Sequence, residues 1–273
     1  MVGWRAKSVT ETMSNDTARP QAEHLREHTK ALLDPIALAP EARVLDLGCG
    51  RGGALDLLSE LAGPSGCVVG LDQDATSLAA ARALVREREL GNVEIVQADA
   101  RATGLPRSSF DLVHVEMLLV NLPAPEQVVE EIARLVKPGG WVAAMEPDHA
   151  LRVCNPPHPA LQRLCGLLAM AHRQDGADSY VGRRLPHLLA TAGMADIAVE
   201  ARAPVYPPGH PQRTLCPDLV RNLRPRILRW GLIDERELDR LDHAARLHLD
   251  DPETLSVPVT YFVARARKPA WAA

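Results

Sequence analysis

Long apolar runs are missing from this sequence of 273 residues. A helix that spans a membrane needs about 18 or more consecutive apolar residues, and a secretory signal peptide needs a shorter apolar stretch near the N-terminus. The first 20 residues contain no such stretch. We therefore expect a cytoplasmic protein with no membrane partner.

Cysteine is scarce, and its spacing fits neither a disulfide framework nor a zinc site. The chain has five cysteines, an odd number, scattered from Cys49 to Cys216 without a CxxC pair. Small disulfide scaffolds use an even number of cysteines, and zinc ribbons use paired CxxC ligands. We therefore expect reduced thiols and no bound metal.

An excess of positive charge is also absent. The chain has 31 basic and 35 acidic residues, which gives a formal net charge of -4. Because nucleic-acid-binding domains depend on a positive field, we expect no nucleic-acid partner. Four Trp, three Tyr and two Phe offer few aromatic surfaces, so a planar substrate would be held between aliphatic side chains.

The sequence does contain a regular alternation of short hydrophobic runs and amphipathic stretches. The short runs, rich in Val, Ile and Leu, predict strands, and the longer stretches between them predict helices. Strands that are hydrophobic on both faces and alternate with helices are typical of a parallel sheet covered on both sides. We therefore predict an α/β fold with a doubly wound, mostly parallel, seven-stranded sheet, with strands at Arg43–Leu47, Cys67–Leu71, Val93–Gln97, Asp111–Val115, Trp141–Met145, Asp196–Tyr206 and Val257–Ala266.

The same patterns divide the chain into segments. Residues 1–17 are polar, which predicts a flexible N-terminus, and within residues 18–40 apolar residues at helical spacing predict an amphipathic helix. Residues 41–206 and 257–268 contain the alternating strands and helices of the core. Prolines at positions 207, 208 and 211 mark a break, and residues 207–256 are predicted to be a helical insertion between the last two strands.

A glycine-rich loop follows the first predicted strand. Gly48, Gly50 and Gly53 satisfy the GxGxxG spacing, and Asp72 lies at the end of the next strand, as in dinucleotide-binding folds. An NAD-dependent oxidoreductase is therefore one alternative. Asp46 argues against it, because a carboxylate directly before the loop would repel a pyrophosphate and attract a cationic ligand.

These residues resemble the class I S-adenosylmethionine-dependent methyltransferases, in particular the small-molecule branch of ubiquinone-pathway and natural-product enzymes. The resemblance covers Val44 to about Asp148. The matching elements, in chain order, are Asp46 with Gly48, Gly50 and Gly52; Asp72; Asp99 with Ala100; the run Phe110–Val113; and the turn Leu135–Gly140.

The resemblance implies a Rossmann-like methyltransferase fold and a site for S-adenosylmethionine, whose reaction product is S-adenosylhomocysteine. A carboxylate such as that of Asp72 suits the two ribose hydroxyls, because it offers two acceptor oxygens. The implied cofactor-binding residues are Asp46, Gly48, Cys49 and Gly50 at the methionine end, Asp72 at the ribose, and Gln73, Asp99 and Ala100 at the adenine.

Glu116 and His149 are the candidate catalytic residues. Glu116 lies five residues after Asp111, where amino-methylating members of the superfamily have an Asp or Asn, and it either acts as a general base or binds the cofactor's ammonium group. His149 follows the fifth strand and could titrate near neutral pH. His114 shares a strand with Glu116 and is expected to be a hydrogen-bonded core residue.

The segments outside the core are expected to cover the site. In the family the N-terminal helix often forms a lid, so His24 or Arg26 could cover the cofactor carboxylate. The residues His24 to His28 also spell HxxEH, an inverted form of a zinc-protease motif, to which we assign no metal. The insertion is expected to form a cap over the substrate, with arginines that either bind an anionic acceptor or pair with nearby acids; these are Arg213, Arg221, Arg224, Arg226 and Arg229.

We therefore predict an enzyme of the S-adenosylmethionine-dependent methyltransferase class (EC 2.1.1) that methylates O, N or C of a small metabolite by in-line displacement. Its partner would be a small-molecule acceptor, and the chain would be a monomer or homodimer. Two alternatives remain open: the NAD-dependent oxidoreductase, and a protein that binds S-adenosylmethionine without transferring its methyl group.

Overall fold

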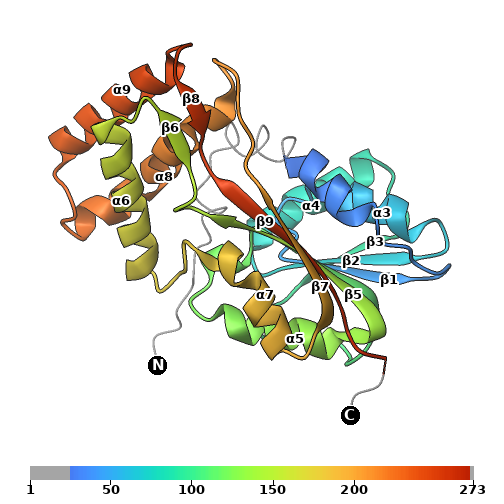
Figure 1. Cartoon of the computed structure of the whole chain (residues 1–273). Helices are drawn as coiled ribbons and strands as arrows, with labels where there is room; N and C mark the ends of the chain where they lie inside the picture. The colour runs from blue at the N-terminus through green and yellow to red at the C-terminus, as the bar shows by residue number, and fades with distance from the viewer. Residues whose placement is uncertain (1–24, 271–273) are drawn as a thin grey trace.

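A seven-stranded sheet forms the centre of the computed structural model, which describes residues 25–270 (Figure 1). Its strand order is β3-β2-β1-β4-β5-β9-β7; the first five strands are parallel, and β9 is antiparallel to both of its neighbours. The prediction of a doubly wound, mostly parallel α/β sheet is confirmed. The strands are β1 (Arg43–Leu47), β2 (Cys67–Asp72), β3 (Val93–Gln97), β4 (Phe110–Glu116), β5 (Val136–Asp148), β7 (Ala195–Arg202) and β9 (Thr260–Arg267).

Helices cover both faces of this sheet (Figure 1). Successive side chains of β1 pack on opposite faces of the sheet. Val44 belongs to one buried cluster, and Leu45 and Leu47 belong to the other. The strands are therefore apolar on both sides, as parallel strands between two helical layers must be. The first cluster includes α3 (Leu55–Ala62), α4 (Ala75–Glu87) and the helical residues 25–33, and the second includes α5 (Pro125–Leu135) and α7 (Val181–Thr191).

The amphipathic pattern explains why α5 forms and how it packs. Its buried residues Val128, Val129, Ile132 and Leu135 follow helical spacing and form one apolar stripe toward the sheet. Pro125 occupies the first turn, where a missing N–H breaks no helical hydrogen bond. The helix ends at Leu135, and β5 begins at the next residue.

The last predicted strand is interrupted, which corrects the expected range Val257–Ala266. Pro258 separates the short strand β8 (Leu255–Val257) from β9. Proline has no N–H to donate to a strand ladder, so it breaks the pairing at this point. β8 pairs instead with β6 (Val153–Asn155) in a separate two-stranded sheet.

A second lobe stands over the carboxyl ends of the parallel strands (Figure 1). We call it the cap lobe; it consists of α6 (Pro159–Gln174), α8 (Leu215–Arg229), α9 (Glu235–Asp250) and the β6–β8 sheet. The insertion 207–256 supplies α8, α9 and all of β8 except Val257. By contrast, α6 falls within the range 41–206 that we expected in the core, yet it packs against α8 and α9.

Some of the expected features lie outside the described residues. These are the flexible segment 1–17, residues 18–24 of the N-terminal helix, and His24 of the HxxEH pattern. Within the range that is described, no helix has the length and apolar character needed to cross a membrane.

Gly182 fixes how closely α7 can approach the sheet. A Cβ at this position would lie 2.7 Å from the backbone oxygen of Glu146 and 2.8 Å from that of Pro147. Because backbone cannot move aside like a side-chain tip, we expect Gly182→Ala to lower the free energy of unfolding by about 1–3 kcal/mol. Chemical denaturation measures this loss.

Gly166 in α6 provides the matched control for Gly182. A Cβ there would meet no atom within 4 Å, so Gly166→Ala should gain up to about 1 kcal/mol from helix propensity. Equal effects of the two alanines would contradict the close approach of α7 to β5.

Candidate functional site

One cavity lies at the carboxyl ends of the parallel strands, between the sheet, the helical residues 25–33 and the cap lobe. It collects nearly all the site residues expected from the sequence, with Asp46 as the exception. The expected residues that line it are Gly48, Cys49, Gly50, Asp72, Gln73, Asp99, Ala100, Glu116 and His149.

The glycine loop and Asp72 are joined by hydrogen bonds at one end of the cavity. The backbone N–H of Gly50 donates to Oδ2 of Asp72 at 2.9 Å, and the N–H of Asp74 donates to Oδ1 at 2.9 Å. Burial raises the pKa of the Asp72 carboxyl, while these N–H donors oppose the rise. Each carboxyl oxygen keeps a further acceptor position, so Asp72 can still accept ligand hydroxyls.

Backbone conformation explains why this loop uses glycine. Gly48 and Gly50 have φ values of +80° and +52°, in the region that residues with a Cβ rarely adopt. A Cβ on Gly48 would lie 2.9 Å from the Leu118 side chain, whereas one on Gly50 would meet no atom within 4 Å. Burial and the charge of Asp46 raise the pKa of the Cys49 thiol, which is therefore neutral.

Asp46 lies behind the loop and does not line the cavity, so its expected role as a cofactor ligand stays a prediction. Its carboxylate is buried and forms a 2.8 Å hydrogen bond with Nδ1 of His114. Although burial opposes a charged imidazole, the Asp46 carboxylate raises the pKa of His114. His114 is the hydrogen-bonded core residue predicted above.

Asp99 and Ala100 line the cavity beyond β3. Asp99 forms an ion pair of 2.6 Å with Arg101, and this hydrogen bond lowers the pKa of the Asp99 carboxyl. The sequence did not indicate this pair. Asp99 is therefore a carboxylate whose charge is partly neutralised, which suits a neutral heterocycle better than a cation.

Glu116 is the last residue of β4 and lies beside the helical residues 25–33. Thr29 from this helix donates a hydrogen bond of 2.6 Å from Oγ1 to Oε2 of Glu116. The Glu116 side chain is 18% exposed, and burial raises its pKa. Thr29 was not a predicted site residue; the available signal was a polar position within the apolar stripe of Leu25, Leu32 and Leu33.

His149, the second candidate catalytic residue, is a buried histidine. It is 5% exposed and packs edge-on against His172 of α6, with ring centroids 5.6 Å apart. Burial lowers the pKa of His149 well below its usual value and that of His172 to about 4. Both imidazoles are therefore neutral, and His149 is a weak base.

Glu146 is an acidic residue beside the cavity that we did not predict. It is fully buried at the end of β5, and its carboxyl group accepts hydrogen bonds from the N–H groups of Leu118, Leu119 and Val120 at 2.7–3.1 Å. Leu118 and Val120 line the cavity. Glu146 therefore holds in place the backbone that forms this wall.

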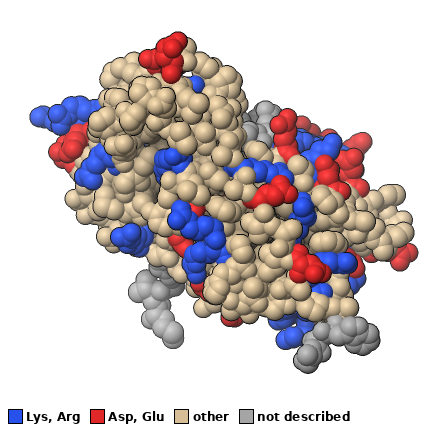
Figure 2. All heavy atoms as spheres, in the orientation of Figure 1, with Lys and Arg blue, Asp and Glu red and all other residues tan. Residues whose placement is uncertain are grey.

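None of the five insertion arginines named above lines the cavity. Arg213 is buried and donates to the backbone oxygens of Tyr206, Leu249, Asp251 and Thr254. Arg221, Arg224 and Arg226 form ion pairs with acidic side chains. Acidic and basic side chains also alternate over the face seen in Figure 2, as expected for surface pairs.

Comparison with known proteins supports the assignment suggested by these residues. Residues 44–140 match the model of a methyltransferase domain family. The demethylmenaquinone methyltransferase of Lactococcus lactis subsp. lactis is 42% identical over 106 residues, which cover 39% of this chain and 42% of that protein. The chain thus spans less than half the length of this curated relative.

Solved structures resemble nearly the whole chain at low sequence identity. Phosphoethanolamine N-methyltransferase 2 of Haemonchus contortus, in complex with S-adenosylhomocysteine, gives a TM-score of 0.61 at 17% identity and covers 97% of this chain and 60% of that one. The cyclase SpnF gives a TM-score of 0.60 at 18% identity and covers 91% and 83%. At such identities the likeness shows the fold alone.

The sheet order, the five sequence elements and the matched domain agree with one another. The glycine loop lies between β1 and α3, where the resemblance requires it, and the matched residues 44–140 include β1 through the start of β5. Residues 44–140 thus match a methyltransferase domain family, and the elements around the cavity are similar to those of the class I S-adenosylmethionine-dependent methyltransferases of the small-molecule type.

Proposed function

We propose that the protein is an enzyme that transfers the methyl group of S-adenosylmethionine to an oxygen, nitrogen or carbon atom of a small metabolite. The main support is that loops after β1, β2, β3 and β4 meet at one cavity. Ligands of open α/β sheets bind at this edge. There the fold brings together the glycine loop, Asp72, Asp99 and Glu116.

The residues present fit the cofactor. The space above Gly50, where a Cβ would meet no atom within 4 Å, leaves room for a ligand to approach the backbone. Asp72 would hold the ribose, Asp99 and Ala100 the adenine, and Glu116 is the candidate partner of the ammonium group. The match to a methyltransferase domain and the complex of the Haemonchus contortus enzyme with S-adenosylhomocysteine point to the same cofactor.

A dinucleotide would fit the same residues less well. The Glu116 carboxylate lines the cavity together with the glycine loop, and its negative charge would disfavour a diphosphate. Of the lining arginines, Arg26 is already held by Asp56 through two contacts of 2.7 Å. Arg51 is exposed and would suit a single carboxylate, such as that of the methionine portion.

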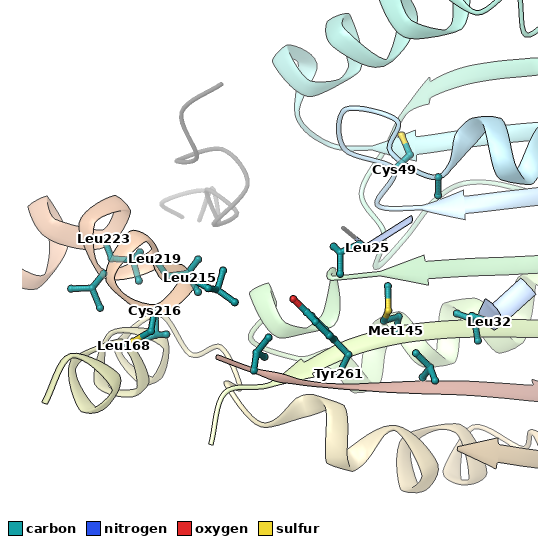
Figure 3. Packing of buried hydrophobic residues seen from close by; sticks show 14 of the residues in the cluster. Leu25, Leu32, Cys49, Met145, Leu168, Leu215, Cys216, Leu219, Leu223 and Tyr261 are labelled. Atoms are coloured by element: carbon teal, nitrogen blue, oxygen red, sulfur yellow. The ribbon is translucent and has the colours of Figure 1, made fainter. Parts of the chain in front are cut away.

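The acceptor end of the cavity is mainly apolar. Leu215 and Leu219 of α8 and Val259 line it, and Tyr261 reaches from β9 toward α8 (Figure 3). Because the insertion arginines do not line the cavity, a carboxylate or phosphate on the acceptor would lack a basic partner from this segment. We therefore propose an uncharged, largely apolar acceptor.

S-adenosylmethionine would supply an electrophilic sulfonium methyl group. The chain's own task is then to place the acceptor in line with this group and exclude water. The apolar walls from the cap lobe would exclude water, and Glu116 would hold the proton of an acidic acceptor.

Isothermal calorimetry with S-adenosylhomocysteine and with NAD tests the proposed cofactor. We expect S-adenosylhomocysteine to bind and NAD to give no heat. Incubation with S-adenosylmethionine and a panel of apolar phenols, amines and enols should then produce S-adenosylhomocysteine and a methylated acceptor. Binding of NAD alone would contradict the proposed cofactor, and cofactor binding without any methylated product would contradict transfer.

Glu116→Gln separates the two roles of this residue. If Glu116 is a general base, kcat should fall by about 10²- to 10⁴-fold, while the Kd for S-adenosylhomocysteine changes little. An equal loss in both quantities would instead identify Glu116 as the ligand of the ammonium group.

Thr29→Val gives the matched test, because it removes the hydroxyl that donates to Glu116 and keeps the side-chain shape. Loss of a donor to the ionised carboxylate raises its pKa further. A general base must be ionised, so the rising limb of the pH–rate profile should move to higher pH. A uniform loss of rate at every pH would contradict the role as a base.

A further inference from the structure

Two cysteines from different helices meet inside the cap lobe. Cys165 on α6 and Cys216 on α8 are 51 residues apart in the chain, yet their Sγ atoms lie 3.3 Å apart. Both are free thiols. Arg152 donates a hydrogen bond from its guanidinium to Sγ of Cys165.

The surroundings make the two thiols unequal. The hydrogen bond with Cys216 and the cationic Arg152 outweigh burial and lower the pKa of Cys165 to about 7. The hydrogen bond with Cys165 and burial raise the pKa of Cys216. Cys216 is 4% exposed, whereas Cys165 is only partly buried. A reagent from solvent would therefore meet Cys165 first, and Cys165 has the greater thiolate character.

We propose that Cys165 and Cys216 form a redox-active dithiol site that reacts with small disulfides and closes to an intrachain disulfide between α6 and α8. In the first step, the Cys165 thiolate attacks one sulfur of the small disulfide and releases one thiolate. In the second step, Cys216 loses its proton to that thiolate and attacks Sγ of Cys165, releasing the second thiolate. The protein dithiol is oxidised, and one small disulfide is reduced to two thiols.

The proposed disulfide would join two helices that form walls of the cavity. Leu215 and Leu219 on α8 and His172 on α6 all line it. Figure 3 shows Cys216 beside Leu168 of α6, with Leu215 and Leu219 on the same helix as Cys216. A covalent link at this contact would fix the separation of these walls. The inference concerns the cap lobe and does not depend on the proposed methyl transfer.

Oxidised glutathione is the probe for the test. After incubation of the reduced full-length protein, a thiol titration in denaturant should fall from the five cysteines of the sequence to three. Peptide mapping without reductant should find the peptide of Cys165 linked to that of Cys216, and dithiothreitol should reverse the link. Retention of all five thiols, or a link to another cysteine, would overturn the proposal.

Single variants separate the two roles. Cys216→Ser should stop at a stable mixed disulfide on Cys165, and Cys165→Ser should form neither an adduct at Cys216 nor a link. Cys154→Ser and Cys67→Ser are controls that should behave like the wild type. An adduct on Cys216 in the Cys165→Ser variant would contradict the assignment of Cys165 as the attacking thiol.

Hydrogen exchange measures the consequence for the cap lobe. In the oxidised wild type, amides of α6 and α8 should exchange more slowly than in the reduced protein, while those of β1 to β4 should not change. Cys165→Ser treated in the same way should show no slowing. Equal exchange of α6 and α8 in the two wild-type states would contradict the proposed link between the cavity walls.

Discussion

Replacing Asp72 with alanine should weaken the binding of S-adenosylhomocysteine about 10- to 100-fold, which corresponds to about 1.4–2.8 kcal/mol. A hydrogen bond to a charged group contributes about 1.5–3 kcal/mol. The alanine variant has no carboxylate and therefore cannot bond the ribose hydroxyls. The substitution also removes the hydrogen bond to the N–H of Gly50, which holds the glycine loop against β2, and the local hydrogen bond to the N–H of Asp74. Calorimetry measures the change in Kd.

Two further variants sharpen this prediction. Asp72→Asn keeps an acceptor oxygen and the side-chain size, so its loss should be smaller than that of Asp72→Ala. Asp111→Ala removes a carboxylate that forms a 2.7 Å ion pair with Lys137 at the opposite end of β4 from Glu116, and it should leave the Kd unchanged. If Asp72→Ala binds S-adenosylhomocysteine as tightly as the wild type does, Asp72 does not hold the ribose of the cofactor.

The parts of the fold that sequence could predict are those set by local pattern. The strands β1 to β4 lie at the apolar runs that predicted them. The position of α6 was not predictable in this way, because its apolar face fits either a sheet or another helix. Its packing against α8 depends on residues more than 40 positions later in the chain.

In the candidate site, too, the residues set by local pattern could be predicted, whereas the contacts between distant elements could not. The glycine loop, Asp72 and Asp99 could be found because each lies at or just after the end of a strand, and parallel strands end at one edge. The partners of Glu116 and Asp46 could not, because Thr29 and His114 meet them across elements that are distant in sequence. Spacing along a strand reveals which residues reach an edge, but it does not reveal which of them are already paired.

Glu146, which the sequence analysis did not single out, should contribute strongly to stability. We expect Glu146→Gln to lower the free energy of unfolding by about 1–3 kcal/mol. The amide oxygen could still accept from Leu118 and Leu119, whose N–H groups share one carboxyl oxygen. The new NH₂ group would then face the N–H of Val120, which is also a donor. Chemical denaturation at constant pH measures the loss, and Glu130→Gln on the exposed face of α5 serves as the control.

The size of this loss should depend on pH in a defined direction. Burial raises the pKa of Glu146 from 4.5 to about 8 in the folded protein, so between these values the folded state binds a proton that the unfolded state has released. The contribution is fully present below the unfolded pKa and is lost as the pH rises through about 8. The stability difference between wild type and Glu146→Gln should therefore shrink between about pH 5 and about pH 9. A difference that stays constant or grows over this range would mean that the three N–H donors keep the carboxylate ionised in the folded state.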